Sequence, residues 1–251
     1  MKRLVIAHHL GLGDHIMLNG MVRHFIEIYD EVYLFIRKVH EESVKFMYRD
    51  VEHQVKLLLL GDPIPPRWQT MLPDDADIMG LATYGFEKRE TWNNYTNVFN
   101  WAHIIYLQAK VNPYYMYSKF KVVRAKSHEL TPPKGEYIFI HDKSKEEFKS
   151  DEKSYIVRKC KENSTIAKYA PGVTEEIESN IFKYISIIEN AKEVYCTNSS
   201  WAWLIELMNI GDSSKNYLDI DANHTYYDKH TTKTVFRDTI WTYVTNETSL
   251  Q

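Results

Sequence analysis

The sequence predicts an α/β protein made of two consecutive open parallel sheets with helices on their faces. Over the first 60 residues, apolar β-branched runs alternate with amphipathic stretches in the order β-α-β-α-β. The same alternation restarts after residue 135. Between the two stretches, the polar segment 126–135 contains two prolines and a glycine, which is typical of a linker.

Each element of the first half follows from its hydrophobic pattern. Residues 2–7 are apolar and β-branched, as in a buried parallel strand. Residues 15–29 carry apolar side chains at spacings of three and four, as on one face of a helix. The other elements follow the same two patterns. They are strands at 31–36, 54–60, 77–83 and, at an edge, 119–124, and helices at 41–48 and 94–109.

The second half shows the same two hydrophobic patterns as the first. A strand at 136–141 ends in a polar turn, and a helix at 181–190 follows a Pro-Gly pair. The remaining elements are strands at 155–160, 193–197 and 217–220, a helix at 201–208 and a closing helix at 235–244. We therefore expect an N-terminal domain (1–125), a C-terminal domain (135–234) and a closing segment (235–251) that packs back towards the first domain.

Composition excludes several classes of protein. The chain has 251 residues, 44% of them hydrophobic, and a formal net charge of −3, which suits two α/β domains of about 120 residues each. No apolar run approaches the roughly 20 residues of a membrane helix, and no signal peptide is evident. We therefore expect a cytoplasmic protein without an integral membrane segment, with peripheral association left open.

Basic and acidic residues are interspersed, which argues against nucleic-acid binding. Cys160 and Cys196 are too few for a disulfide framework.

The turn after the first strand is the first candidate site, and it spans residues 8–14, His-His-Leu-Gly-Leu-Gly-Asp. Ligands of parallel sheets bind beyond the carboxyl ends of the strands. Glycine lets a ligand approach the backbone, and the amides that open a helix attract anions. Gly11 and Gly13 are therefore candidates for binding an anionic group such as a diphosphate. Asp14 has two interpretations: a base kept ionised by the helix dipole, or the N-cap of a helix that begins at His15.

Two common nucleotide motifs fail at this turn. Gly11 and Gly13 begin the dinucleotide pattern, but Ile16 occupies the third glycine position and the second strand ends in Arg37 instead of an acidic residue. An NADP enzyme that uses Arg37 remains an alternative. A methyltransferase would need the missing acidic residue, and no Gly-Lys-Ser/Thr follows at the spacing of a P-loop.

The segment from Leu10 to Arg23 resembles the N-terminal segment of the heptosyltransferase-like glycosyltransferases of family 9. Members of that family have the GT-B fold, in which two Rossmann-like domains face a cleft. The resemblance implies a compact GT-B protein in which Asp14 is the general base that removes a proton from an acceptor hydroxyl. The candidate acceptor-binding residues at the same turn are His9, His15 and Asn19.

The second half is similar to the same family in outline. Residues 185–201 resemble its helix, strand and small-residue turn, which implies that the turn binds the diphosphate of the donor. The family usually carries Asp-Thr-Gly and a histidine at this turn, whereas the Ser-Ser-Trp form here is closer to fucosyltransferase-like enzymes. The turn after the strand at 136–141 is expected to form the other end of the donor site. The candidate donor-binding residues of the two turns are His141, Lys143, Ser144, Lys145, Asn198, Ser199 and Ser200.

The resemblance implies an inverting, metal-independent transfer of a sugar from a nucleotide-sugar donor to a glycan or glycolipid hydroxyl, with no cofactor. Lys143 or Lys145 would neutralise the leaving diphosphate in place of a metal. One alternative is a single-domain GT-A enzyme that binds a metal ion through an Asp-x-Asp pair. The candidate pairs are Asp219 with Asp221, and Asp75 with Asp77. Another alternative is a nucleotide- or sugar-binding module without catalysis.

Overall fold

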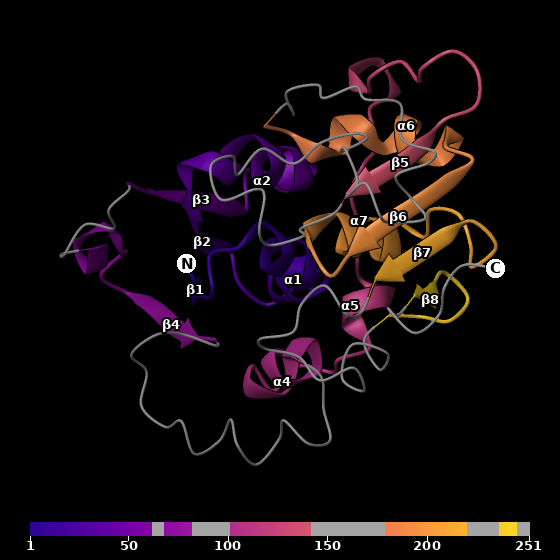
Figure 1. The fold of residues 1–251 in the computed structure, drawn as a ribbon. Coiled ribbons are helices and arrows are strands. Elements are labelled where there is room, and N and C mark those ends of the chain that lie inside the picture. The colour runs from indigo at the N-terminus through magenta and orange to yellow at the C-terminus, as the bar shows by residue number, and fades with distance from the viewer. Residues whose placement is uncertain (62–67, 82–100, 142–178, 220–235, 245–251) are drawn as a thin grey trace. The chain divides into compact units, whose positions relative to one another are not determined.

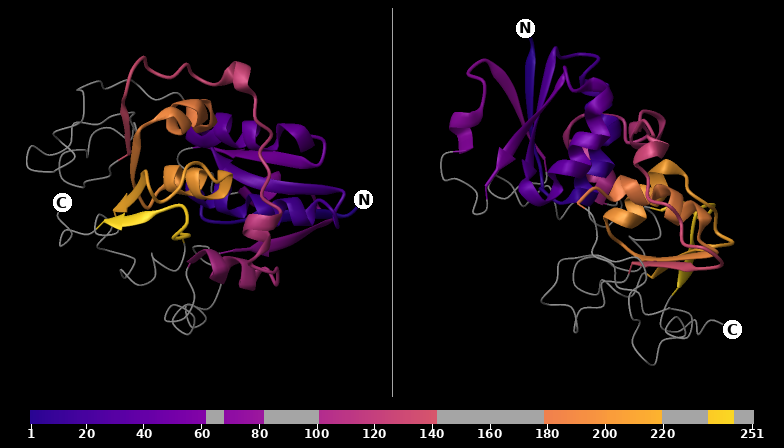
Figure 2. Two further views of the ribbon diagram at one scale, coloured as in Figure 1. Left: turned by 90° about the vertical axis from the view of Figure 1, so that its right-hand side faces the viewer. Right: turned by 90° about the horizontal axis from the view of Figure 1, so that it is seen from above.

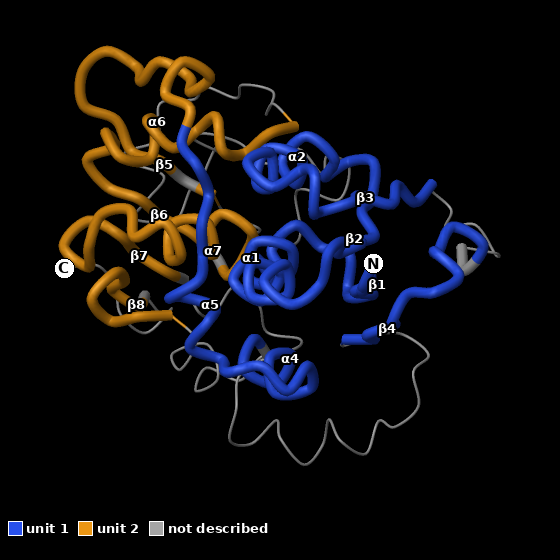
Figure 3. The backbone as a smooth tube through the Cα atoms, turned by 180° about the vertical axis from the view of Figure 1, so that it is seen from behind, with its two compact units in different colours: residues 1–124 blue, residues 125–251 orange. Residues whose placement is uncertain are grey.

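The computed structural model describes residues 1–61, 68–81, 101–141, 179–219 and 236–244 (Figure 1). The chain divides into two compact units, residues 1–124 and residues 125–251, which Figure 3 colours separately. Each unit contains a four-stranded sheet in which neighbouring strands pair in parallel. The predicted α/β class with two parallel sheets is confirmed.

The first unit is built around β1, which lies inside its sheet. The strand order is β3-β2-β1-β4, and the side chains of Leu4, Val5 and Ile6 are 1%, 0% and 0% exposed. Because both faces of β1 are covered, nearly every residue of the strand is apolar. The elements are β1 (Arg3–Ala7), α1 (Leu12–Phe25), β2 (Glu31–Arg37), η1 (Lys38–His40), α2 (Glu41–Tyr48), η2 (Arg49–Val51), β3 (Val55–Leu60), η3 (Trp68–Met71), β4 (Ala76–Gly80), α4 (Trp101–Gln108) and α5 (Tyr115–Ser118).

The edge strand expected at residues 119–124 is wrong, since this segment is irregular. Its backbone groups bond to side chains of α1 instead of to a neighbouring strand. The N–H of Lys121 donates to Oδ1 of Asn19 (2.8 Å), and the Lys121 carbonyl accepts from Nη2 of Arg23 (2.9 Å). These bonds satisfy the backbone without a sheet, so the alternating pattern of the segment does not produce a strand.

Helix α1 crosses α5 at a glycine. A Cβ at Gly20 would lie 2.0 Å from the carbonyl oxygen of Tyr115 and 3.1 Å from Cα of Met116. Both are backbone atoms, which cannot move aside as the end of a flexible side chain can. The glycine therefore sets how closely the two helices approach.

We expect Gly20→Ala to lower the free energy of unfolding of the first unit by about 1–3 kcal/mol, the usual cost of overpacking. Alanine in a helix is otherwise favoured over glycine by about 1 kcal/mol, so a net loss reports the clash itself. Urea unfolding of the full chain, followed by circular dichroism, measures the difference. A variant as stable as the wild type, or more stable, would contradict the close crossing.

The second unit has the strand order β5-β6-β7-β8, and Figure 2 shows both sheets from two further directions. Its core includes Phe139 and Val194 from the sheet, each 0% exposed, and Trp201 from α7, 1% exposed. The helix expected at 181–190 begins as a 3-10 turn, and the strand expected at 155–160 lies outside the described residues. The elements are η4 (Lys126–His128), β5 (Ile138–His141), η6 (Ile181–Tyr184), α6 (Ile185–Asn190), β6 (Glu193–Thr197), α7 (Ser200–Met208), β7 (Asn216–Asp219) and β8 (Thr242–Val244).

The closing helix expected at residues 235–244 is wrong, because the described part of this segment consists of turns and the strand β8, which pairs with β7. Its apolar residues pack inside the second unit: Phe236 and Trp241 are 3% and 1% exposed. Nε of Arg237 and Nε1 of Trp241 donate to the two carboxylate oxygens of Glu206 on α7, at 2.6 and 2.9 Å. These tertiary bonds to a buried carboxylate outweigh the local helical pattern.

Candidate functional site

The first candidate site lies where β1 ends and α1 begins. Helix α1 starts at Leu12, earlier than the sequence pattern predicted, and Gly11 is its N-cap residue. Asp14 is therefore inside the first turn of the helix, and the N-cap role considered for it is wrong. This position places the carboxylate near the positive end of the helix dipole.

The Asp14 carboxylate folds back over Gly11 and contacts His9. A Cβ at Gly11 would lie 2.7 Å from Oδ2 of Asp14, and this oxygen is 3.1 Å from Nδ1 of His9. The side chain of Asp14 is 16% exposed and that of His9 is 49% exposed. A diphosphate close to Gly11 would meet the negative charge of Asp14, so the first turn is better suited to a hydroxyl acceptor than to an anion.

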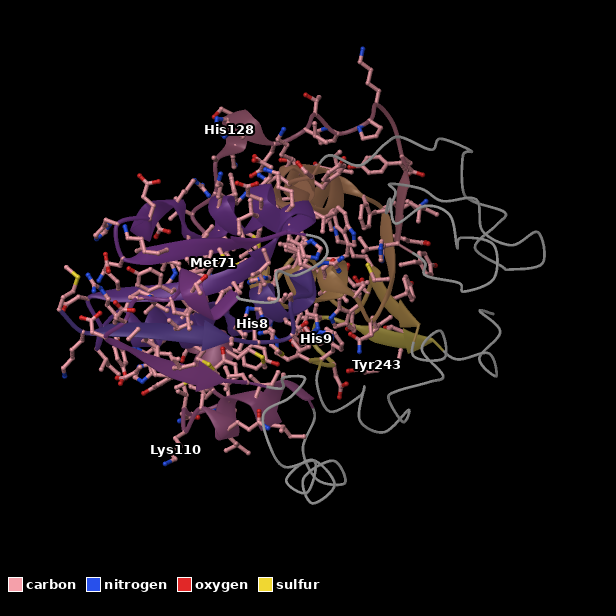
Figure 4. The ribbon with its side chains drawn as sticks, turned by 90° about the vertical axis from the view of Figure 1, so that its left-hand side faces the viewer. His8, His9, Met71, Lys110, His128 and Tyr243 are labelled. Carbon is pink, nitrogen blue, oxygen red and sulfur yellow. The ribbon has the colours of Figure 1, made fainter. Side chains whose placement is uncertain are left out.

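Two buried imidazoles, those of His8 and His15, support this turn. Figure 4 labels His8 and the exposed His9 beside it. His8 and His15 are 5% and 0% exposed, and their rings meet edge to face with centroids 4.3 Å apart. Nδ1 of His8 is 2.7 Å from the carbonyl oxygen of His9, and because a carbonyl only accepts, this nitrogen carries the proton. Burial lowers the pKa of His8 and lowers that of His15 well below its ordinary value, so both rings are neutral at neutral pH.

The remaining polar residues of α1 point into the first unit. Asn19 is 0% exposed and Arg23 is 7% exposed. Nη1 and Nη2 of Arg23 donate to the carboxylate of Asp50 (3.0 and 2.7 Å), and Nη2 also donates to the carbonyl of Met47 (3.2 Å). Of the three acceptor-binding candidates, His9 alone is exposed; His15 is buried against the ring of His8, and Asn19 is buried and accepts from the N–H of Lys121.

The second candidate site lies where β6 ends and α7 begins. Ser199 is the N-cap residue of α7, with extended backbone angles (φ −156°, ψ 177°), but its side chain makes no capping bond to the helix. Its hydroxyl is instead 3.1 Å from Nδ1 of His141 at the end of β5. The side chain of Ser199 thus accepts no hydrogen bond from the N–H groups of the first turn of α7, and N–H groups at the start of a helix bind anions.

An aromatic cluster fixes the start of α7. The ring of Trp201 lies 5.3 Å from that of Phe139, 5.4 Å from that of Tyr184 and 5.9 Å from that of His141, between centroids. The same cluster therefore holds both the helix terminus and the imidazole that bonds to Ser199. This rigid setting keeps the helix N–H groups in one orientation.

The other donor-binding candidates differ in burial. Asn198 and Ser200 flank Ser199 and are partly exposed, whereas Ser199 and His141 are buried. Lys143, Ser144 and Lys145 lie outside the described residues, so their expected role stays a prediction.

Two pairs of aspartates belong to the metal-binding alternative. Asp75 pairs with Nη1 of Arg3 at 2.7 Å, and Asp77 accepts from the hydroxyl of Tyr29 at 3.1 Å. Asp219 ends β7, and Asp221 is outside the described residues. In the part of the chain that the structure describes, no three His, Cys, Asp or Glu side chains are grouped as a metal site. In the same part of the chain, no helix has the length and apolar character needed to cross a bilayer.

The pattern of the sequence did not reveal the role of His8, whose ring bonds to the backbone of the candidate site. The signal that could have found it is the pair of adjacent histidines at the end of a buried strand. Side chains alternate along a strand, so one of two successive polar residues is directed towards the interior. A buried imidazole requires a hydrogen-bond partner, and the nearby backbone provides one.

Among the comparisons with known proteins, the one with solved structures finds matches. No protein-family model matches the sequence, and no curated protein matches it. A glycosyl transferase family 9 structure from Veillonella parvula DSM 2008 matches with 9% identity and a TM-score of 0.53, over 98% of this chain and 86% of that chain. The iron-containing dodecameric glycosyltransferase TibC from enterotoxigenic E. coli H10407 matches with 13% identity and a TM-score of 0.49, over 86% of this chain, which spans 57% of TibC. At such identities, the likeness to the Veillonella structure establishes the fold alone.

Proposed function

We propose that the chain is a glycosyltransferase that moves a sugar from a nucleotide-sugar donor to a hydroxyl of a glycan or glycolipid, with inversion and without a metal. The observation that carries the proposal is the Asp14 carboxylate in the first turn of α1, bonded to an exposed imidazole, in a chain with the fold of a family 9 glycosyltransferase. In such folds, acid–base chemistry is expected just beyond the carboxyl ends of the parallel strands, which is where the carboxylate of Asp14 lies.

The proposed reaction is a direct displacement. The acceptor hydroxyl loses its proton to the base at Asp14, its oxygen attacks the anomeric carbon, and the nucleoside diphosphate leaves from the opposite face. The first unit binds the acceptor and the second unit binds the donor. The N–H groups that open α7, with Asn198 and Ser200, hold the diphosphate through charge-assisted hydrogen bonds. This requires both turns to face one substrate pair.

The donor site is testable before the sugar is known. We expect one of UDP, GDP, ADP and CMP, or its sugar conjugate, to raise the melting temperature of the full chain. A ligand at a hundred times its Kd stabilises a fold by about 2.7 kcal/mol. The matched variant is Ser200→Pro, because Ser200 is the first residue of α7 and Ser199 before it is already extended. Proline there keeps the helix start and removes two donors that the proposal places on the diphosphate, the N–H and the hydroxyl of Ser200.

Loss of one such charge-assisted hydrogen bond, about 1.5–3 kcal/mol, corresponds to a roughly 10- to 100-fold weaker affinity for the nucleotide, and we expect at least this loss in the variant. Isothermal titration of the wild type and the variant gives the ratio. Equal affinities would contradict a diphosphate site at the start of α7.

Transfer that EDTA abolishes and Mn²⁺ restores would favour the metal-dependent alternative. Nucleotide binding without any transfer would favour the binding module.

A further inference from the structure

The hydrogen bond between His9 and Asp14 fixes which ring nitrogen of His9 is basic. Oδ2 of the carboxylate lies 3.1 Å from Nδ1 of His9. An ionised carboxylate only accepts, so Nδ1 carries the proton. In the neutral ring the lone pair is then on Nε2, on the side of the imidazole away from the carboxylate. The pair therefore has the form of a base oriented by an acid residue.

The backbone at His9 is fixed as firmly as its side chain. Its carbonyl accepts the Nδ1–H of His8 at 2.7 Å, and the His8 ring packs edge to face against the fully buried His15. Both supporting rings stay neutral because burial lowers their pKa. They hold His9 in place without adding positive charge beside it. A catalytic side chain needs such support from its neighbours.

Exposure and basicity both favour the imidazole over the carboxylate as the group that meets an acceptor. The side chain of His9 is 49% exposed, against 16% for Asp14. The hydrogen bond from Asp14 raises the pKa of His9, with partial burial acting in the opposite direction. Asp14 and the neighbouring His8 are among the titratable groups that act on His9. A general base works best when its pKa is near the working pH, which suits an imidazole.

We infer that His9 receives the acceptor proton at Nε2, and that Asp14 orients the ring and offsets the charge of the imidazolium that forms. This rests on the proposed function and makes His9, supported by Asp14, the group that takes the proton in place of Asp14 itself. The acceptor O–H bond breaks and its proton goes to Nε2. The oxygen forms a bond to the anomeric carbon, and the bond from that carbon to the phosphate oxygen breaks with its electron pair on the nucleoside diphosphate. The imidazolium then loses its proton to water.

The test compares His9→Gln with His53→Gln in the full chain. Glutamine at position 9 keeps a hydrogen-bond donor for Asp14 but has no basic nitrogen, and His53 is an exposed histidine of the same unit. We expect His9→Gln to lower kcat/KM by about 100- to 1,000-fold and to remove the acidic limb of its pH profile. Nucleotide affinity should stay within a few-fold, and His53→Gln should match the wild type.

A second readout does not need turnover. In an NMR titration of the full chain, the pKa of His9 should fall in Asp14→Asn compared with the wild type, because the carboxylate no longer stabilises the imidazolium. An unchanged pKa, or a His9→Gln variant that keeps more than a third of the wild-type kcat/KM, would overturn the role of His9 and leave the proposed function standing. Absence of transfer by the wild-type chain with every donor that binds would overturn the proposed function and the role of His9 together.

Discussion

Asp14→Asn is expected to lower kcat/KM by about 10²–10⁴-fold, the range that general-base catalysis contributes. The amide has nearly the shape of the carboxylate, so the turn between β1 and α1 should keep its structure. It has no negative charge, however, to drive proton removal or to stabilise an imidazolium at His9. Nucleotide affinity should change by no more than a few-fold, because the diphosphate is bound by the second unit in the proposed mechanism. Steady-state kinetics with the donor that binds, together with nucleotide titration, measures both quantities.

Asp75→Asn provides the matched control for this variant. Asp75 lies in the same unit and its side chain is 60% exposed. If the metal-dependent alternative used the Asp75 and Asp77 pair, this substitution would abolish transfer. In the proposed mechanism it leaves kcat/KM unchanged. An Asp14→Asn variant with a near wild-type rate would contradict the role of the first turn.

Arg23→Met is expected to lower the free energy of unfolding of the first unit by about 3–5 kcal/mol, the usual cost of removing one partner from a buried ion pair. The guanidinium of Arg23 bonds to Asp50 and to the carbonyls of Met47 and Lys121. All of these acceptors lose a donor in the variant. The Asp50 side chain is 19% exposed and regains some water, which favours the lower end of the range. Urea unfolding gives the value, and a loss below about 1 kcal/mol, typical of an exposed pair, would contradict the assignment.

The pH dependence gives an independent check on this ion pair. Partial burial is the largest single influence on the pKa of Asp50 and raises it, but the hydrogen bonds and charge of Arg23, with smaller contributions from the backbone and Lys121, together lower it by more, so the pKa in the folded chain lies below its ordinary value. A carboxyl group with a depressed pKa stabilises the fold above its unfolded pKa of about 3.9, and this contribution is lost as the pH falls through the folded pKa. We expect Arg23→Met to be less sensitive to acid over this range than the wild type.

Elements with a strong local pattern could be predicted from the sequence. Helix α2 and strand β6 have the bounds expected from periodicity alone. The start of α1 was predicted less accurately. Gly11 and Gly13 are both typical of turns, but the buried Leu12 between them is already the first residue of the helix. The strand predicted at 119–124 and the helix predicted at 235–244 were wrong for a different reason. The backbones and side chains of these segments bond to groups distant in the sequence, and a local pattern does not indicate such partners.

The candidate sites divide in the same way. The two turns could be located, because strand ends and glycines mark them in the sequence. The contact of His141 with Ser199 depends on the pairing of β5 with β6, which sets His141 opposite Cys196. Glu206 is the one charged residue of α7 and is fully buried, so it needs a partner, and only the structure identifies that partner as Arg237. The cleft expected between the two domains stays a prediction.

The most direct test of the central claim is a crystal structure of the full chain with the nucleoside diphosphate that binds most tightly. The proposed mechanism predicts phosphate oxygens within hydrogen-bond distance of the N–H groups that open α7, with the His9–Asp14 pair facing the side where the sugar would extend. A diphosphate bound at the Gly11 turn, or a His9–Asp14 pair directed away from the bound nucleotide, would contradict the mechanism.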